Sequence, residues 1–379
     1  MIGAGVFGAW TAYKLQGAGL SVALIDAYGP ANSRASSGGE TRILRMGYGA
    51  DEIYTRSALR SFTDWQQLEA TTHQSVFCQT GVLWLARDDD AYVRSTRETL
   101  ERTGVRFELF SRSDLEQQFP QMSFGKTAWG ILEPDSGVLM ARRAVQALVK
   151  QAETKGVTFI REKVVPSARE GRPAQSDFGA VTAHSGKRIS AGMFVFACGP
   201  WLGQVFPELL GELIHVTRQE VLFFGVPPGD SRYSPPAMPT WIDFNDLVYC
   251  LPEIEGRGVK IAIDAHGAEF DPESGDRTVT AEGVQAGRKH LAERLRALAD
   301  APVLETRVCQ YENTSNGDFL IDRHPEFDNV WLVGGGSGHG FKHGPAVGEY
   351  LTAQLLGRGE VEPRFSLSTK AKVRHRAVF

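Results

Sequence analysis

The chain has 379 residues, which corresponds to about two domains at ~150 residues each. Its 41 Lys and Arg against 45 Asp and Glu give a formal net charge of −4, which argues against a nucleic-acid-binding protein with a basic face. The hydrophobic content is 42% and no apolar run approaches the ~20 residues of a membrane span, so we expect an ordered cytoplasmic protein without a membrane partner. The four cysteines are scattered and do not have the spacing of metal ligands. The glycine content is high, with 41 glycines, or about 11% of the chain against a usual ~7%.

The first 26 residues carry the clearest local motif, a βα turn of the dinucleotide-binding kind. It consists of Gly3, Gly5 and Gly8 in a GxGxxG pattern, a predicted helix over 9–15, a predicted strand over 22–25, and Asp26. Such glycines let a pyrophosphate approach a helix N-terminus, and the acid accepts hydrogen bonds from a ribose. The alternative is a glycine-rich turn that binds nothing. The strand that should precede the turn is nearly absent, so we expect that several leading residues are missing from this sequence.

The middle of the chain mixes both kinds of secondary structure, with a β-rich stretch over 158–200. Apolar spacing predicts helices over 51–69, 88–104, 140–155 and 279–298, and strands over 76–85, 157–160, 193–197, 218–226, 247–251 and 258–264. Near the C-terminus a strand over 330–333 leads into the glycine-rich run 334–340 and a helix over 345–356. Because both ends supply a strand, a glycine turn and a helix, we predict two interleaved domains of an α/β fold, one of which holds a nucleotide.

Several short segments occur in the same order as in a known family. They are residues 26–27, 40–45, 80–83, 133–139, 308–311, 338–342 and 348–349. In them the chain resembles the monomeric sarcosine oxidase and N-methyltryptophan oxidase family of D-amino-acid-oxidase-like FAD amine oxidases. The resemblance implies a Rossmann-like FAD-binding domain interleaved with a mixed-β-sheet substrate domain, as in p-hydroxybenzoate hydroxylase. The FAD-binding domain would comprise 1–80, 143–210 and 310–379, and the substrate domain 81–142 and 211–309.

The resemblance also implies roles for individual residues. Gly3, Gly5, Gly8 and Asp26 would bind the adenylate half of FAD, and Gly338, Gly340, Phe341 and Lys342 would form the loop beside the flavin. Cys309 would attach covalently to the flavin, with Arg42 beside the ring. Arg45 and Lys342 would bind a substrate carboxylate, Tyr249 would line the substrate pocket, and Lys260 would promote reaction of reduced flavin with O2. Two cations near one flavin edge also suit a carboxylate and the negative charge of reduced flavin.

Two departures from the family pattern alter the charge and size of the predicted substrate pocket. The segment 38–40 stands where sarcosine oxidase has a histidine, and Asp264 replaces a pocket histidine four positions after Lys260. We therefore consider two hypotheses for Asp264, namely recognition of a second cationic group on the substrate or a hydrogen bond to Lys260.

Each candidate also has a purely structural interpretation. Cys309 could be a half-buried free thiol, Lys260 an outward lysine on an edge strand, and Arg45 a surface ion-pair partner. Cys78, Cys198 and Cys250 are expected in the core. His339 is expected to pack in the flavin loop rather than to act as a base, and His266 and His343 are placed too weakly for an assignment.

The sequence therefore predicts an FAD-dependent oxidase of a small carboxylate-bearing amine, with a secondary or N-methyl amino acid as substrate and O2 as acceptor. Such an enzyme needs no metal, and we expect a monomer or a small homo-oligomer. Three alternatives stay open at this point. They are an FAD-dependent amino-acid or hydroxy-acid dehydrogenase with a non-oxygen acceptor, an NAD(P) enzyme that uses the same turn, and a non-catalytic flavin-binding subunit.

Overall fold

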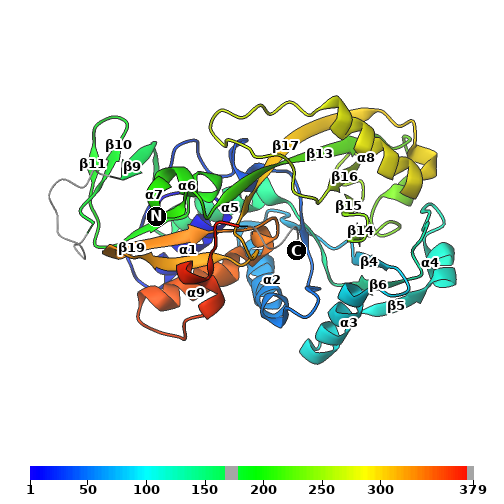
Figure 1. Cartoon of the computed structure of the whole chain (residues 1–379), viewed down its shortest axis with the longest axis horizontal. Helices are drawn as coiled ribbons and strands as arrows, with labels where there is room; N and C mark the ends of the chain where they lie inside the picture. Colours follow the sequence, from blue (N-terminus) through cyan, green and yellow to red (C-terminus); the bar gives the residue numbers. More distant parts are fainter. Residues whose placement is uncertain (167–177, 374–379) are drawn as a thin grey trace.

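The computed structural model describes residues 1–166 and 178–373, so that part of the predicted β-rich stretch, 167–177, lies outside the described residues. The molecule is elongated, with two sheets side by side along its length (Figure 1). The long strands β13 (His215–Phe224) and β17 (Val303–Asn313) run from the middle of the molecule into its second half.

The first sheet is the one that carries the N-terminal glycine turn. Its strands are β8 (Thr158–Arg161), β1 (Ala23–Asp26), β12 (Phe194–Phe196), β19 (Phe327–Gly334) and β18 (Leu320–His324). β1 pairs with β8 in parallel, and β12 pairs with β19 in parallel. Ile2 bridges both Ile25 and Phe196, so this single residue joins the two strand pairs into one sheet. The order places the end of β1 beside the turn that leads into the first helix.

Three helices pack together beside this sheet. They are α1 (Val6–Gly17), α5 (Ala141–Thr154) and α9 (Gly344–Leu355). α1 is apolar on most of its surface and lies between the other two, which explains why so many of its side chains are buried. A Cβ at Gly348 would lie 2.8 Å from the carbonyl carbon of Trp10, so glycine at this position allows α9 to approach α1 closely. The packing therefore connects the first and last parts of the chain.

The second sheet has eight strands in the order β17-β13-β16-β15-β14-β4-β6-β5. The bounds not yet given are β4 (Val82–Ala86), β5 (Glu108–Ser111), β6 (Trp129–Glu133), β14 (Thr240–Asp243), β15 (Val248–Leu251) and β16 (Val259–Ile263). All neighbours are antiparallel except β14 and β4, so the predicted mixed sheet is confirmed. The helix α8 (Ala281–Arg294) packs on β13 and β16.

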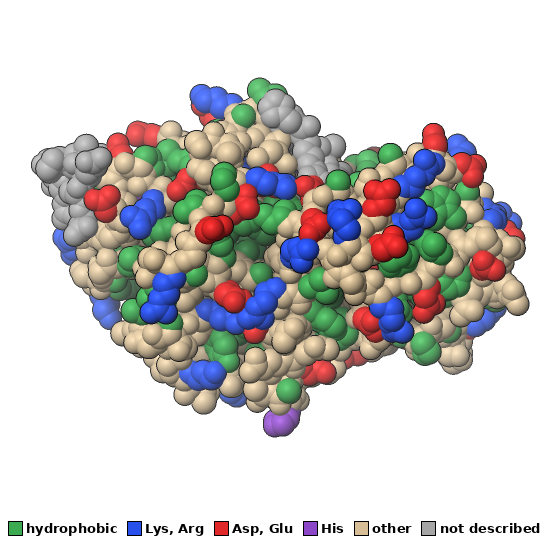
Figure 2. Space-filling view, turned by 90° about the horizontal axis from the view of Figure 1, so that it is seen from below, with side chains coloured by type: hydrophobic (Ala, Val, Ile, Leu, Met, Phe, Trp, Pro, Cys, Tyr) green, Lys and Arg blue, Asp and Glu red, His purple; other side chains and the backbone are tan. Residues whose placement is uncertain are grey.

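The remaining sheets of the described chain are short, and five further α-helices pack around the two larger sheets. They are β2 (Arg42–Leu44), β3 (Phe77–Cys78) and β7 (Gly137–Leu139) in one sheet, β9 (Val164–Pro166), β10 (Val181–Ala183) and β11 (Arg188–Ile189) in another, and the helices α2 (Glu52–Thr72), α3 (Ala91–Thr103), α4 (Arg112–Gln118), α6 (Leu202–Val205) and α7 (Pro207–Leu210). Among the described residues no helix is both long and apolar enough to cross a membrane. Figure 2 shows positive and negative side chains interspersed over one face of the described molecule, as expected from the small net charge.

Three predicted elements differ from the structure. The strand predicted over 76–85 is two strands, β3 and β4, because the chain turns at Gly81 with φ 69°. The helix predicted over 88–104 begins only at Ala91, since the side chain of Asp90 caps it by accepting a hydrogen bond from Val93 N. The helix predicted over 279–298 ends at Arg294 and continues as a separate 3-10 turn.

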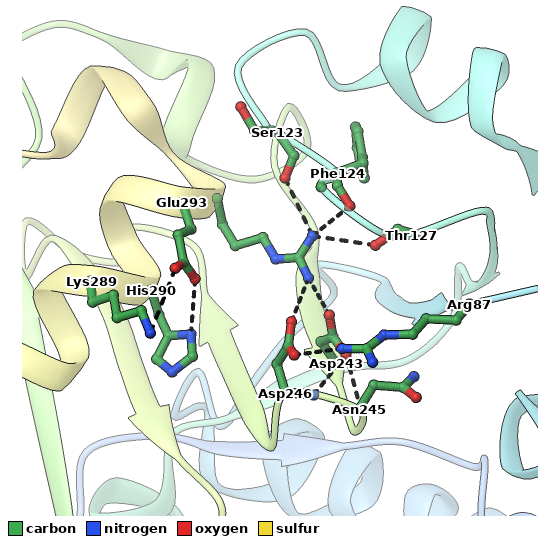
Figure 3. A network of polar contacts seen from close by, with 12 residues as sticks. Arg87, Ser123, Phe124, Thr127, Asp243, Asn245, Asp246, Lys289, His290 and Glu293 are labelled. Atoms are coloured by element: carbon green, nitrogen blue, oxygen red, sulfur yellow. Dashed lines mark hydrogen bonds and ion pairs between the residues drawn. The ribbon is translucent and has the colours of Figure 1, made fainter.

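A buried ion-pair network fixes α8 to the second sheet (Figure 3). Arg294 is only 5% exposed and forms ion pairs with Asp243 and, at 3.1 Å, with Asp246. It also donates a hydrogen bond of 2.7 Å to the carbonyl oxygen of Phe124, and Arg87 pairs with Asp246 at 2.6 Å. Because Asp243 ends β14 and Asp246 lies in the turn between β14 and β15, the network holds that turn in place.

Candidate active site

The first of two adjoining cavities lies at the N-terminal glycine turn. Its lining includes the predicted cofactor residues Gly3, Gly5, Asp26, Arg42, Cys309, Gly338, Gly340 and Phe341. The cavity thus brings the glycine turn, the flavin-side arginine and the C-terminal loop together, as the sequence predicted. Gly8 does not line it, but a Cβ there would lie 1.9 Å from the carbonyl oxygen of Gly3, so glycine keeps the helix against the turn.

The geometry of the turn suits a bound dinucleotide. Gly3 has φ 103°, and a Cβ at this position would lie 2.2 Å from the carbonyl oxygen of Ala197. Gly5 precedes α1, and Ser37 Oγ accepts a hydrogen bond from Val6 N at 3.0 Å. The first turn of that helix borders the cavity, where its other backbone N–H groups favour an anion. A cavity with a helix N-terminus at its wall fits the pyrophosphate of FAD.

Asp26 both shapes the turn and faces the cavity. One carboxylate oxygen accepts from Ala4 N at 2.8 Å, and the other accepts from Tyr28 N and Gly29 N at 2.9 and 2.8 Å. Burial raises the pKa of Asp26, and these three hydrogen bonds oppose the rise. A carboxylate offers about four acceptor positions, so one remains for a ribose hydroxyl.

The second cavity gathers the predicted substrate-side residues. Its lining includes Arg42, Arg45, Tyr249, Lys260, Asp264 and Lys342. Five residues line both cavities, and they are Arg42, Cys309, Tyr311, Gly338 and Phe341. A group that extended from the first cavity to this shared wall would therefore face the cations of the second.

Arg42 and Cys309 meet at the shared wall although they are far apart in the chain. Arg42 Nη2 donates to Cys309 Sγ at 3.2 Å, and Arg42 Nη1 donates to the carbonyl oxygen of Thr41 at 2.8 Å. Cys309 is 8% exposed and lies on β17, which the antiparallel pairing with β13 holds in register. The thiol therefore lies at the wall that the two cavities share.

Arg45 is buried in an aromatic surrounding, and the interpretation as a surface ion-pair partner is wrong. Its guanidinium carbon lies 4.2 Å from the ring centre of Tyr48 and 5.0 Å from that of Trp84. The segment that follows Arg45 is held by Glu133 on β6, whose carboxylate accepts from Met46 N at 2.7 Å, Gly47 N at 2.9 Å and Trp84 Nε1 at 2.7 Å. The second sheet thus positions a cation that belongs to the N-terminal part of the chain.

Lys342 approaches the same cavity from the C-terminal loop. Its Nζ donates to Tyr48 Oη at 2.7 Å and to the carbonyl oxygen of His339 at 3.1 Å, and the residue is 4% exposed. Burial and the nearby Arg45 lower the pKa of Lys342 well below its ordinary value, while Asp264 opposes this shift. Arg45 and Lys342 therefore lie together at the second cavity, where the charges of Asp264 and Glu133 favour the ammonium form of the lysine.

Lys260 points inward from β16, which has a neighbour on each side, so the edge-strand interpretation is wrong. The residue is 3% exposed, and its Nζ donates to the carbonyl oxygen of Thr41 at 2.9 Å and to Thr41 Oγ1 at 3.2 Å. Burial and then the charge of Arg42 lower the pKa of Lys260 to about 7. Near neutral pH this ammonium is therefore partly deprotonated.

Asp264 follows the end of β16 and is bound by a tyrosine rather than by the lysine. Tyr311 Oη donates to Asp264 Oδ1 at 2.7 Å, whereas Lys260 donates to Thr41. The hypothesis of a hydrogen bond between Asp264 and Lys260 is therefore wrong. Burial raises the pKa of Asp264 to about 6, although Tyr311 and the cations Arg45 and Lys342 favour the ionised form.

Tyr249 on β15 completes this wall. Its ring centre lies 5.9 Å from Lys260 Nζ, and burial followed by the charge of Asp264 raises the pKa of its hydroxyl. The structure thus brings every predicted substrate-side residue to one cavity.

The cysteine and histidine predictions are only partly confirmed. Cys250 is fully buried, but Cys78 is half-buried, and Cys198 is half-buried at the wall of the first cavity, so neither is a core residue. Cys198 departs from the prediction because its strand ends before it and the chain turns along the cavity. His339 is packed as predicted, since its ring stacks on Phe319 and its Nε2 contacts the carbonyl oxygen of Gly317 at 3.1 Å.

Three functional neighbours were missed by sequence reasoning. Thr41 binds Lys260, Tyr48 binds Lys342 and packs on Arg45, and Tyr311 binds Asp264. Thr41 and Tyr48 lie within three residues of the predicted arginines, and Tyr311 lies two residues after Cys309. A search for side chains on the same strand face, at a spacing of two, would have found Tyr311.

Comparisons with known proteins agree with this geometry. The model of the family described as DAO, FAD dependent oxidoreductase, matches residues 1–354. A monomeric sarcosine oxidase of Bacillus sp. (strain NS-129) is 31% identical over 374 residues, which cover 97% of this chain and 94% of that protein. A peroxisomal sarcosine oxidase of Mus musculus is 32% identical over 360 residues, with coverage of 93% and 90%.

Solved structures show the same fold at lower identity. An L-proline dehydrogenase from P. horikoshii superposes with a TM-score of 0.82 at 22% identity, covering 97% of this chain and 95% of that one. NikD, described as an unusual amino acid oxidase essential for nikkomycin biosynthesis, gives a TM-score of 0.80 at 20% identity, with coverage of 99% and 98%. At these identities the likeness concerns the fold alone.

Proposed function

Since the chain belongs to the DAO family of FAD-dependent oxidoreductases and is an FAD-dependent amine oxidoreductase related to sarcosine oxidases, we propose that it oxidises a small secondary or N-methyl amino acid with O2 as electron acceptor. The observation that carries this proposal is the convergence of Arg45 and Lys342 in a cavity that shares a wall with the cofactor cavity. Arg45 and Lys342 lie in the cavity that adjoins the predicted flavin position. Two cations there suit a substrate whose carboxylate lies near its reacting carbon.

FAD would occupy the first cavity and extend to the shared wall. Gly3, Gly5, Gly8 and Asp26 would bind its adenylate half, and the loop with Gly338, Gly340, Phe341 and Lys342 would lie beside the flavin. We propose a covalent bond between Cys309 and the flavin, supported by the position of its sulfur beside Arg42. FAD, when bound, accepts a hydride equivalent from the amine carbon and returns the electrons to O2 as H2O2.

The protein's own residues would bind and orient the amine. Arg45 and Lys342 would bind the carboxylate, and Tyr249 and Asp264 would border the rest of the substrate. Arg42 would favour negative charge on the reduced flavin, and Lys260 would stabilise superoxide during reoxidation. The cationic surroundings lower the pKa of a bound ammonium, which favours the neutral amine that reacts.

The finer organisation of the protein is part of the same proposal. The described strands support the interleaved division, because the first sheet uses residues of 1–80, 143–210 and 310–379, and most of the second uses 81–142 and 211–309.

We also propose a monomer or small homo-oligomer in the cytoplasm, although two mammalian relatives are named peroxisomal.

An anaerobic screen followed by admission of O2 tests this function. Sarcosine, N-methyl-L-tryptophan and L-proline are mixed with the holoenzyme, and at least one should bleach the flavin absorbance. N-methylethylamine, which lacks the carboxylate, is the matched control and should bleach it far more slowly. O2 consumption with stoichiometric H2O2 should follow. Equal bleaching by the control would refute the carboxylate site, and bleached flavin that O2 fails to restore would favour a dehydrogenase.

A further inference from the structure

A chain of hydrogen bonds leads from the second cavity to the outer part of α2. Lys342 Nζ donates to Tyr48 Oη at 2.7 Å, Tyr48 Oη is 2.7 Å from His343 Nε2, and His343 Nδ1 is 2.9 Å from Ser57 Oγ. Tyr48 is 1% exposed and His343 is fully buried, whereas Ser57 is half-buried on α2. Four polar side chains therefore connect a buried ammonium to a group near the surface.

The chemistry of these groups gives the chain one direction. A lysine ammonium can only donate, so Tyr48 Oη accepts from Lys342 and points its own hydrogen toward His343 Nε2. Nε2 must then be the unprotonated nitrogen of a neutral imidazole, and the Nδ1–H donates to Ser57 Oγ. Burial, together with the charge of Lys342, lowers the pKa of His343 well below its ordinary value, which agrees with a neutral ring.

The other described groups around Lys342 make different contacts. Arg45 only donates, Asp264 is bound by Tyr311, and Glu133 accepts backbone and indole hydrogen bonds. His339 contributes its carbonyl oxygen to Lys342, and its Nε2 contacts a backbone oxygen. Among the described hydrogen bonds of these groups, the one through Tyr48 reaches toward the surface.

Amine oxidation requires a route by which a proton can leave the second cavity. An aliphatic ammonium has a pKa near ~10, so a secondary amino acid arrives protonated at neutral pH. One N–H bond of the ammonium breaks and releases a proton, and then the C–H bond breaks with its electron pair passing to FAD, which leaves the iminium product. Each turnover that starts from the ammonium must therefore export one proton from the cavity.

We propose that Lys342, Tyr48, His343 and Ser57 form the path by which this proton leaves. Lys342 receives the proton from the substrate, directly or through a water molecule. At the same time the lysine passes one of its own hydrogens to Tyr48. Tyr48 passes its hydrogen to His343 Nε2, and His343 passes the Nδ1 hydrogen to Ser57 and solvent. Lys342 ends with three hydrogens and its positive charge, so the path is compatible with carboxylate binding. Tyr48, His343 and Ser57 act through Lys342 and are positioning residues.

Because the path rests on the proposed function, its test separates the two. The holoenzyme is mixed anaerobically with whichever of sarcosine, N-methyl-L-tryptophan and L-proline bleaches the flavin fastest, in weak buffer with a pH indicator. In the wild type one proton per flavin should appear together with bleaching. Y48F keeps the ring on Arg45 and should slow proton release by about tenfold or more.

Variants on α2 supply the matched comparison. S57A should slow proton release, and S57T, which keeps the hydroxyl, should restore it. S61A, one turn further along the helix, removes a hydroxyl that binds Ala346 N and lies outside the path, and should behave as wild type. Proton release at the wild-type rate in both Y48F and S57A would overturn the proposal. A rise in KM in these two variants with no change in the rate of proton release would also overturn it.

A second measurement needs no turnover. Nitrogen-15 NMR of the histidine rings, assigned with H343Q, should show His343 neutral with its proton on Nδ1. A cationic His343, or a proton on Nε2, would overturn the path. If no amine bleaches the wild-type flavin, the proposed function fails, and the NMR result still decides whether the ordered donor chain exists.

Discussion

Replacement of Lys260 by Met should slow the reaction of reduced flavin with O2 and affect flavin reduction much less. Met retains most of the apolar stem and removes the charge. Within the described residues Lys260 forms no ion pair, and its Nζ is held by the carbonyl and hydroxyl oxygens of Thr41 at 2.9 and 3.2 Å. Its charge therefore acts in the second cavity instead of being cancelled by a carboxylate.

The size of the effect follows from Coulomb's law. Lys260 Nζ lies 5.9 Å from the ring centre of Tyr249, and both residues line the second cavity, so we take a similar distance for a superoxide bound there. A unit charge about 6 Å from superoxide, at an effective dielectric constant of about 20, contributes about 3 kcal/mol. That energy corresponds to a factor of about 100 in the rate constant for reoxidation.

The pH dependence follows from the lowered pKa. Lys260 titrates at about 7, so it is mostly charged at pH 6 and mostly neutral at pH 8. The wild-type reoxidation rate should therefore fall by about tenfold between these values, and the K260M rate should stay flat.

Stopped-flow mixing of photoreduced enzyme with oxygenated buffer measures both effects through the return of oxidised flavin absorbance. K163M is the matched control, because Lys163 borders the first cavity and pairs with Glu273 at 2.9 Å. K163M should reoxidise at the wild-type rate. The reasoning fails if K260M reoxidises at nearly the wild-type rate, or if the wild-type rate is equal at pH 6 and pH 8.

Three further predictions concern the cofactor, the fold and the substrate. C309S should release all its yellow FAD on acid precipitation while the wild type keeps it in the pellet, and a colourless wild-type pellet would contradict the covalent bond. R294M leaves the buried Asp243 unpaired and should lower the free energy of unfolding in urea by about 3–5 kcal/mol, whereas the exposed-pair control R232M should barely shift the midpoint. If Asp264 recognises a second cationic group, kcat/KM for N-methyl-lysine relative to N-methyl-norleucine should fall as the pH drops through about 6, where the carboxylate gains a proton. D264N should lack that preference at every pH, and an unchanged ratio would refute the role.

The N-terminal motif was predictable because its geometry is local. Glycine spacing, an apolar helix and a strand that ends in Asp26 follow from neighbouring residues, and the structure forms each of them. The meeting of Arg42 with Cys309 could be expected only from the family resemblance, because 267 positions separate the two residues and they lie in different sheets, on β2 and β17.

The error about Asp264 has a simple physical origin. The hypothesis rested on the short distance in sequence, because Asp264 follows Lys260 by four positions. Four residues of extended chain nevertheless span about 13 Å, which is too far for a hydrogen bond. Both residues line the second cavity, but their partners Thr41 and Tyr311 come from other segments. Such contacts depend on how distant elements pack and are invisible in a single sequence.

The wall shared by the two cavities also sets the timing of cofactor capture during synthesis. Asp26 emerges from the ribosome roughly 280 residues before Cys309, a delay of roughly 14 to 57 s at ~5–20 residues per second. Gly338 and Phe341 follow later still. A nascent chain can therefore form the glycine turn early but has no complete cavity for the flavin ring until synthesis is almost finished. Capture of FAD belongs to the last stage of folding, and a chain truncated before β17 would expose half of the site.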